Sequence, residues 1–221
     1  MKFLLQLVLW VIIGALGYLL FNAVYGEVKF NEIKEKRYQQ AITNLKDIRA
    51  AQLAHKTVTG KYEGDFNKLV KFIDTAKFTL TQRRDSTVLD VEQTRRFQVD
   101  TYKGIVIIDT LGYRSVKDSL FKAPNPDRYK TMINIPIEGI DKKYEMQAGT
   151  IDKTTGTYPV FEAKVSKDVL LWDQPRDYVI KEKQVQSVDA DAVSGEAVSV
   201  GSMLKIDTRG NWGKSYGADD E

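Results

Sequence analysis

The sequence predicts an α+β protein: an N-terminal transmembrane helix continues into a helical stalk and hairpin, followed by a small, mostly antiparallel β domain. Residues 3–24 form an uncharged apolar run in which only Gln6 and Asn22 have clearly polar side chains. Residues 42–58 repeat apolar side chains every three or four positions, as an amphipathic helix does. After Lys77 the chain changes to alternating runs separated by turn residues, which is typical of antiparallel hairpins.

The apolar run at residues 3–24 is long enough to cross a bilayer. At ~1.5 Å per residue it spans roughly 33 Å, against a hydrocarbon core of ~30 Å. We interpret it as an uncleaved signal anchor. The alternatives are a cleaved signal peptide, which has a shorter apolar region, and a core helix, which is rarely apolar on every face. The residues that define the predicted span are Phe3, Trp10, Gly14, Gly17, Tyr18 and Val24.

The charges around the span give opposing indications of its orientation. Lys2 precedes the span, whereas Lys29, Lys34, Lys36 and Arg37 follow it, and positive residues favour the cytoplasmic side. A one-residue head before a span is instead the usual form of a signal anchor whose large domain is translocated. We favour this second interpretation, partly on the resemblance given below, and expect an inner-membrane protein with a periplasmic C-terminal domain.

Composition excludes several classes of function. The 221 residues carry 33 basic and 30 acidic side chains, a net charge of +3, which indicates no nucleic-acid partner. The chain has no cysteine, so it forms no disulfides and has no thiol catalysis or thiolate metal site. Roughly 195 residues remain after the span, enough for one domain with a core of its own.

Two helices are expected between the membrane and the β domain. The first begins in the span and runs to about Thr57, where Thr59 and Gly60 end it. Asp65 caps the second, at residues 66–76, and the two helices fold back as a hairpin. The apolar stripe of the first helix, a candidate interaction surface, consists of Ile42, Leu45, Ile48, Ala51 and Val58.

The β domain is expected to contain a series of short strands. We predict a strand at residues 78–82, a short helix within 85–94 and a buried β-branched strand at 104–109. Further strands are predicted at 113–121, 131–137, 143–151 and 158–165, with turns at 138–139 and 154–156. Ser166 caps a short element at residues 167–172, and the last periodic runs are 177–184 and 196–200. Residues 187–195 read as a mobile loop.

Motifs that carry chemistry are weak, and we predict no catalytic, cofactor-binding or metal-binding residues. Gly213-Lys214-Ser215 imitates the end of a phosphate-binding loop, but Thr208 stands where the motif needs its first glycine. His55, the only histidine, is expected on the surface. Asp189 and Asp191 lack further ligands at the spacing that a cation needs.

Two resemblances bear on the architecture. The order of a spanning helix, its extension through residues 42–62 and then a β domain resembles the layout of type IV pilins and pseudopilins, without their glycine-phenylalanine processing site. The strings IKEKRY, LKDIRAAQLA, GKY, KDSLF, PVFEAK and VGS…GNW are similar to an uncharacterised group of single-span envelope proteins of Gram-negative bacteria. This second resemblance implies an extracytoplasmic soluble part and supplies no catalytic residues.

These observations predict four parts: an anchor at residues 1–25, a stalk and helical hairpin at 26–76, a β-rich domain at 77–206 and a flexible tail at 207–221. The tether and stalk favour a non-enzymatic interaction or structural subunit of an envelope assembly, with an envelope protein or a second copy as partner. One alternative is a membrane-tethered enzyme or ligand-sensing domain whose site is not legible in the sequence. Another is an adaptor that faces the cytoplasm.

Overall fold

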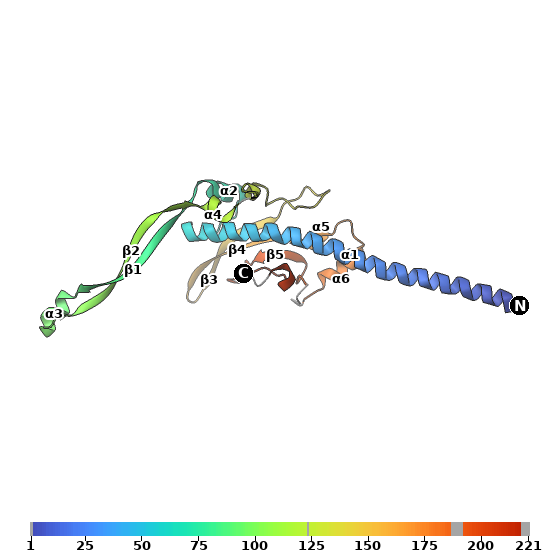
Figure 1. Cartoon of the computed structure of the whole chain (residues 1–221), viewed down its shortest axis with the longest axis horizontal. Coiled ribbons are helices and arrows are strands. Elements are labelled where there is room, and N and C mark those ends of the chain that lie inside the picture. The colour runs from blue at the N-terminus through green and yellow to red at the C-terminus, as the bar shows by residue number, and fades with distance from the viewer. Residues whose placement is uncertain (1, 123, 187–191, 218–221) are drawn as a thin grey trace.

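The computed structural model describes residues 2–122, 124–186 and 192–217, and it has an α+β fold with two small antiparallel sheets (Figure 1). The helices are α1 (Lys2–Thr59), α2 (Phe66–Thr75), α3 (Val91–Phe97), α4 (Val116–Leu120), α5 (Lys167–Leu170) and α6 (Arg176–Lys183), with short 3-10 turns η1 (Arg128–Lys130) and η2 (Lys214–Tyr216). The strands are β1 (Lys77–Leu89), β2 (Tyr102–Ser115), β3 (Glu145–Lys153), β4 (Gly156–Ser166) and β5 (Ala197–Gly201).

Helix α1 is one continuous helix of 58 residues, as the sequence predicts. Its N-terminal part contains an 18-residue window of mean hydropathy 2.2, none of which is buried. By length and composition this part is a candidate membrane span. The helix ends where Gly60 takes a positive φ of 81° and donates its backbone N–H to the Lys56 carbonyl over 2.8 Å. Glycine adopts this left-handed conformation at no steric cost, so it stops the helix here.

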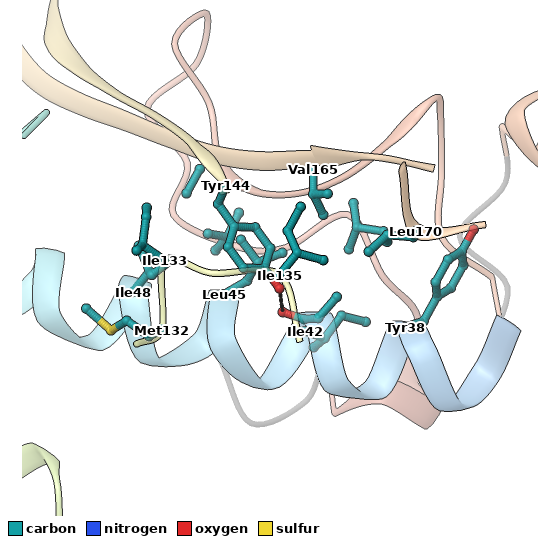
Figure 2. Close-up of a cluster of buried hydrophobic side chains, with 14 of the residues drawn as sticks. Tyr38, Ile42, Leu45, Ile48, Met132, Ile133, Ile135, Tyr144, Val165 and Leu170 are labelled. Carbon is teal, nitrogen blue, oxygen red and sulfur yellow. Dashed lines mark hydrogen bonds between the residues drawn. The ribbon is translucent and has the colours of Figure 1, made fainter. Parts of the chain in front are cut away.

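The C-terminal half of α1 forms one wall of the hydrophobic core. The three-stranded sheet, in the order β3-β4-β5, lies against it. Figure 2 shows side chains of α1 and of the opposite wall meeting between helix and sheet. The Tyr144 hydroxyl crosses this core and donates to the Ala41 carbonyl over 3.2 Å. The labelled core side chains are Tyr38, Ile42, Leu45, Ile48, Met132, Ile133, Ile135, Tyr144, Val165 and Leu170.

Helix α2 folds back against α1, which confirms the predicted helical hairpin. Asp65 caps α2 by accepting a hydrogen bond from the Lys68 backbone N–H over 3.1 Å. Leu69 and Ile73 are fully buried in the same core as the stripe of α1. The loop between the helices is fixed by Gln52, whose side chain bonds both the backbone N–H and the carbonyl of Glu63.

Strands β1 and β2 form a separate antiparallel ribbon, which agrees only in part with three predictions for this region. Residues 85–89 continue β1, and the helix begins only after Asp90 caps it at Val91. The strand at 104–109 exists but is not buried, because no other element covers it. Residues 113–121 are not one strand: β2 ends at Ser115, whose side chain caps α4.

Residues 131–137 were also predicted as a strand, and this prediction was wrong. They form turns with one isolated bridge, between Asn134 and Lys143. Their alternating pattern arises because an irregular segment buries Met132, Ile133 and Ile135 against α1. The predicted strands at 143–151 and 158–165 are confirmed as β3 and β4.

The predicted flexible tail is packed as far as the structure describes it. Trp212 is buried in the core, and isolated bridges join it to Val193 and join Gly210 to Val200. Ser166 caps α5 as predicted, by accepting from the Asp168 backbone N–H. Residues 187–191 of the predicted mobile loop and residues 218–221 of the tail lie outside the described residues.

A substitution at Leu45 tests whether α1 supplies the core. Leu45 is fully buried, so Leu45→Ala removes packed methyl groups and leaves a cavity. We expect it to lower the free energy of unfolding of the full chain in detergent by about 2–5 kcal/mol. Urea denaturation followed by intrinsic fluorescence measures this change. Val58→Ala, on the same helix but exposed, is the control and should change it by less than about 0.5 kcal/mol. Equal effects would mean that α1 is a detached stalk.

Candidate interaction surface

The ribbon of β1 and β2, with α3 at its tip, projects from the body as an arm formed by residues 77–115. Figure 1 shows the arm leaving the body beside the end of α1, away from the N-terminus. The strands pair with each other from Lys77–Ser115 at the base to Leu89–Tyr102 near the tip. In these two strands, all of which the structure describes, no residue is buried. The arm therefore exposes both faces and both edges to solvent.

One face of the arm carries a row of large apolar side chains. Because side chains alternate across a strand and paired residues share a face, the register places Tyr102, Val106 and Ile108 of β2 on the same side. Leu89 pairs with Tyr102 and joins this row. We call this set, completed by Tyr113, the apolar face of the arm. Its five side chains are between 43% and 69% exposed.

A β-bulge puts Tyr113 on the apolar face. Leu80 pairs with Gly112 and Thr81 with Thr110, so Leu111 is an extra residue in β2. Without it, strict alternation from Ile108 would send Tyr113 to the opposite face. The bulge therefore lengthens the apolar row by one aromatic side chain at the base of the arm.

The opposite face carries both polar and apolar side chains, the latter including exposed Leu80 and Val88. Arg84 and Asp109 lie on it and form a 2.5 Å ion pair. Ile105 and Ile107 are only half-exposed there. Arg83 and Asp85, on the apolar face, lie 3.6 Å apart and are both largely exposed.

The tip of the arm is apolar as well. Asp90 caps α3 by accepting from the Gln93 backbone N–H over 3.1 Å, and Gln98 ends the helix in a left-handed conformation with φ 52°. Val91, Phe97 and Val99 are exposed around this turn.

An uncovered ribbon of this composition is unusual in a soluble protein. A two-stranded hairpin is only marginally stable in water unless something packs on it. Open strand edges and apolar patches are normally covered or interrupted by charge. The arm is therefore the part of the described chain best suited to contact another molecule.

The structure places the residues predicted from the sequence in two different environments. The span residues Phe3, Trp10, Gly14, Gly17, Tyr18 and Val24 all lie exposed on the N-terminal part of α1. The stripe divides: its exposed member is Val58, and the other four members, Ile42, Leu45, Ile48 and Ala51, are buried beneath the chain's own β domain. Sequence reasoning missed the arm. The run of β-branched residues at 104–109 is the signal for it, but a buried core strand has the same composition.

A second unusual feature is a cluster of polar groups buried between α1, α5 and α6. The ammonium of Lys167 donates to the carbonyls of Glu182 and Val193, each over 2.7 Å, and to the Glu182 carboxylate over 3.4 Å. Lys34 and Tyr38 of α1 reach the same carboxylate, over 3.1 and 3.4 Å. Three bonds satisfy every donor of the ammonium. The cluster therefore ties α1 to the C-terminal part of the domain.

Burial governs the titration of this cluster. It lowers the pKa of the Lys167 ammonium, although the neighbouring Glu182 carboxylate acts in the opposite direction. It also raises the pKa of the Tyr38 hydroxyl far above its ordinary value, and Glu182 adds to this effect. The tyrosine is therefore a neutral hydrogen-bond donor at physiological pH.

The side chain of His55 departs from the sequence-based expectation. His55, expected on the surface, is only 6% exposed: its Nδ1 lies 2.6 Å from the Lys61 carbonyl oxygen, and its ring packs edge-on against Phe72. It holds the loop that follows α1. Of the tryptophans in the C-terminal part, Trp172 is exposed between α5 and α6, whereas Trp212 is buried.

The described residues contain no group of three or more His, Asp or Glu side chains that could hold a metal ion. Asp189 and Asp191 lie outside the described residues. Lys214 of the Gly-Lys-Ser string belongs to the 3-10 turn η2 rather than to the start of an α-helix. A phosphate-binding loop needs such a helix.

No family model, no curated protein and no solved structure matches this chain. The resemblances to pilins and to single-span envelope proteins therefore stay predictions from the sequence.

Substituting the buried lysine tests the structural role of the polar cluster. Lys167→Met keeps the side-chain length but leaves the buried carbonyls of Glu182 and Val193 without their donor, and it removes one of the three donors to the Glu182 carboxylate. Removing one partner of a buried pair costs about 3–5 kcal/mol, and we expect a loss of this size in urea denaturation. The control is Lys183→Met, which breaks the half-exposed 2.6 Å ion pair with Asp168 and should cost less than about 1 kcal/mol. Similar losses of unfolding free energy for both variants would show that the buried cluster contributes no more to stability than a surface ion pair.

Proposed function

We propose that this chain is a non-enzymatic subunit of a cell-envelope assembly, anchored by a single span in the inner membrane, with its soluble part in the periplasm. The observation that carries the proposal is the exposed arm, held at the opposite end of the molecule from the candidate span (Figure 1). The arm is the contact surface, and an envelope protein or a second copy of this chain is its partner.

The rigidity of α1 supports a role in reaching across a distance. From Val24, where the apolar run ends, to Thr59, the helix rises by about 52 Å, at ~1.5 Å per residue. Neither a proline nor a chain break interrupts it within the described residues. A helix of this kind keeps the arm far from the bilayer instead of letting the soluble part swing freely.

The chemistry of the arm supports binding rather than catalysis. Its apolar face offers Tyr, Ile, Val and Leu side chains, and aromatic residues with neighbouring aliphatic ones are common at the centres of protein interfaces. Its two edges offer unpaired backbone groups, to which an extended strand of a partner can add.

Photocrosslinking tests the arm as a contact surface. We expect a benzoylphenylalanine residue in place of Tyr113, on the apolar face, to crosslink a partner in native membranes. The same residue in place of Phe78, which the register puts on the opposite face, is the matched control and should give little product. Gel analysis with mass spectrometry identifies the product.

Ile108→Asp extends this experiment, because a carboxylate in the middle of the apolar face should abolish the Tyr113 crosslink. Ile107→Asp, one residue away on the opposite face, should preserve it. The proposal fails if Tyr113 and Phe78 positions crosslink equally well, or if neither crosslinks.

The orientation has its own test. If the soluble part is periplasmic, protease added to intact spheroplasts should digest it and leave only a fragment containing the span. Immunoblotting of a C-terminal epitope measures this loss, and a cytoplasmic protein that stays intact is the control. Survival of the soluble part in intact spheroplasts, followed by its digestion after lysis, would instead indicate an adaptor facing the cytoplasm.

A further inference from the structure

Helix α6 lies beside the part of α1 that directly follows the candidate span. The ring of Tyr178 lies 5.1 Å from that of Phe30, and Glu182, one turn further along α6, pairs with Lys34 over 3.1 Å. These two contacts show that the N-terminal turn of α6 faces the span and that its C-terminal end faces away from it. In Figure 1, α6 lies beside α1 near the point where α1 leaves the body toward the N-terminus.

Gly26 of α1 leaves space for the hydroxyl of Tyr178. A Cβ atom at Gly26 would lie 3.2 Å from the Tyr178 hydroxyl, closer than a side chain comfortably allows. Glycine is unfavourable inside a helix by roughly 1 kcal/mol relative to alanine, so its presence here needs a reason. That reason is the room it gives to Tyr178.

The height of these contacts above the span follows from helix geometry. If the apolar run ends at Val24, then Gly26 lies ~3 Å and Phe30 ~9 Å further along the helix. The headgroup layer on each side of a bilayer is about 5–8 Å thick. With this anchor, the Tyr178 hydroxyl next to Gly26 would lie at headgroup level. The rings of Phe21 and Tyr25, just before Gly26 in α1, stack on each other with centroids 5.6 Å apart.

The residues at this level have the chemistry of a membrane interface. Tyrosine is enriched at headgroup depth because its ring is apolar and its hydroxyl is polar. The exposed charged side chains near Tyr178 have both signs: Arg176, Asp177 and Lys181 on α6, and Glu27 and Lys29 on α1. Such a mixed surface, with one positive charge in excess, suits zwitterionic headgroups.

We propose that the N-terminal turn of α6, centred on Tyr178, lies in the phospholipid headgroup layer of the leaflet from which α1 emerges. The contact rests on the proposed membrane anchor. Together with α1 it gives the soluble domain a second attachment to the bilayer, which limits how far the domain can tilt relative to the membrane surface. The contact needs no anionic lipid.

Spin labelling tests this contact directly, because a chain without cysteine accepts a label at one chosen position. Nitroxides are placed singly in the full chain at Asp177→Cys beside Tyr178, at Val8→Cys within the span and at Val99→Cys at the tip of the arm. The protein is reconstituted in phosphatidylcholine vesicles containing a small fraction of nickel-chelating lipid. We expect relaxation by the headgroup nickel to be several-fold stronger at position 177 than at position 99, and unchanged when phosphatidylglycerol is added.

The label at position 8 separates failure of this inference from failure of the anchor. If position 8 is accessible to oxygen and shielded from an aqueous nickel chelate, while position 177 relaxes no faster than position 99, the headgroup contact is wrong and the anchor stands. If position 8 is open to the aqueous chelate, the anchor and the contact both fail. Dependence of the signal at position 177 on phosphatidylglycerol would contradict a contact with neutral headgroups.

Two glycine variants provide a matched pair. Gly26→Leu should displace Tyr178 and weaken the nickel effect at position 177 several-fold. Gly17→Leu, in the same helix but with nothing within 4 Å of the added Cβ, should leave it unchanged. An undiminished signal in Gly26→Leu would overturn the role assigned to Gly26 and Tyr178.

Discussion

The structure depends on a single continuous helix, α1, whose surface changes in character along its length. The N-terminal part of α1 is apolar on all sides and exposed, whereas the C-terminal half is apolar on one side and covers the core of the soluble domain. Because the hydrophobic effect scales with apolar area removed from water, the second half is stabilised by the domain that packs on it. The soluble domain in turn has no complete core without α1. The division into stalk and β domain that the sequence suggests, at residues 76 and 77, therefore separates segments whose side chains share one core.

Polar groups define how the C-terminal part of the chain meets this helix. Apolar packing alone tolerates small shifts of one element against another, whereas a buried ammonium must find its acceptors at fixed positions. Lys167 finds carbonyls from the end of α6 and from Val193, and its carboxylate partner Glu182 also binds two side chains of α1. The Arg37 guanidinium, which makes a bidentate ion pair with Asp173, adds a second fixed point on the same helix and holds the pKa of that carboxyl well below its usual range. Helix α6 is thereby fixed beside the segment that leads into the candidate span.

The sequence predicted those elements whose determinants are local. The continuous helix, the caps at Asp65 and Ser166, and the hairpin of β3 and β4 each follow from neighbouring residues and were confirmed. The failures concern what covers a segment, which is not local information. Residues 131–137 alternate like a strand because they cover α1, and residues 104–109 are as β-branched as a core strand although nothing packs on them. His55 was misplaced for the same reason: its burial comes from Phe72, seventeen positions later in the chain.

The arm shows how one irregularity can set the character of a surface. A shift of one residue in strand pairing moves every following side chain to the other face, so the register of β2 beyond the bulge determines where Tyr113 points. A regular ribbon would place Tyr113 on the face of Phe78 and Leu80. With Leu111 inserted, Tyr113 instead lies on the face of Tyr102, Val106 and Ile108, and the other face holds Ile105, Ile107 and the ion pair of Arg84 and Asp109. The inserted residue gains no contact that favours the isolated chain, since Leu111 itself is 67% exposed. Because the bulge leaves its own leucine exposed while aligning Tyr113 with other apolar side chains, it is better explained by the proposed contact role of the arm than by the stability of the arm alone.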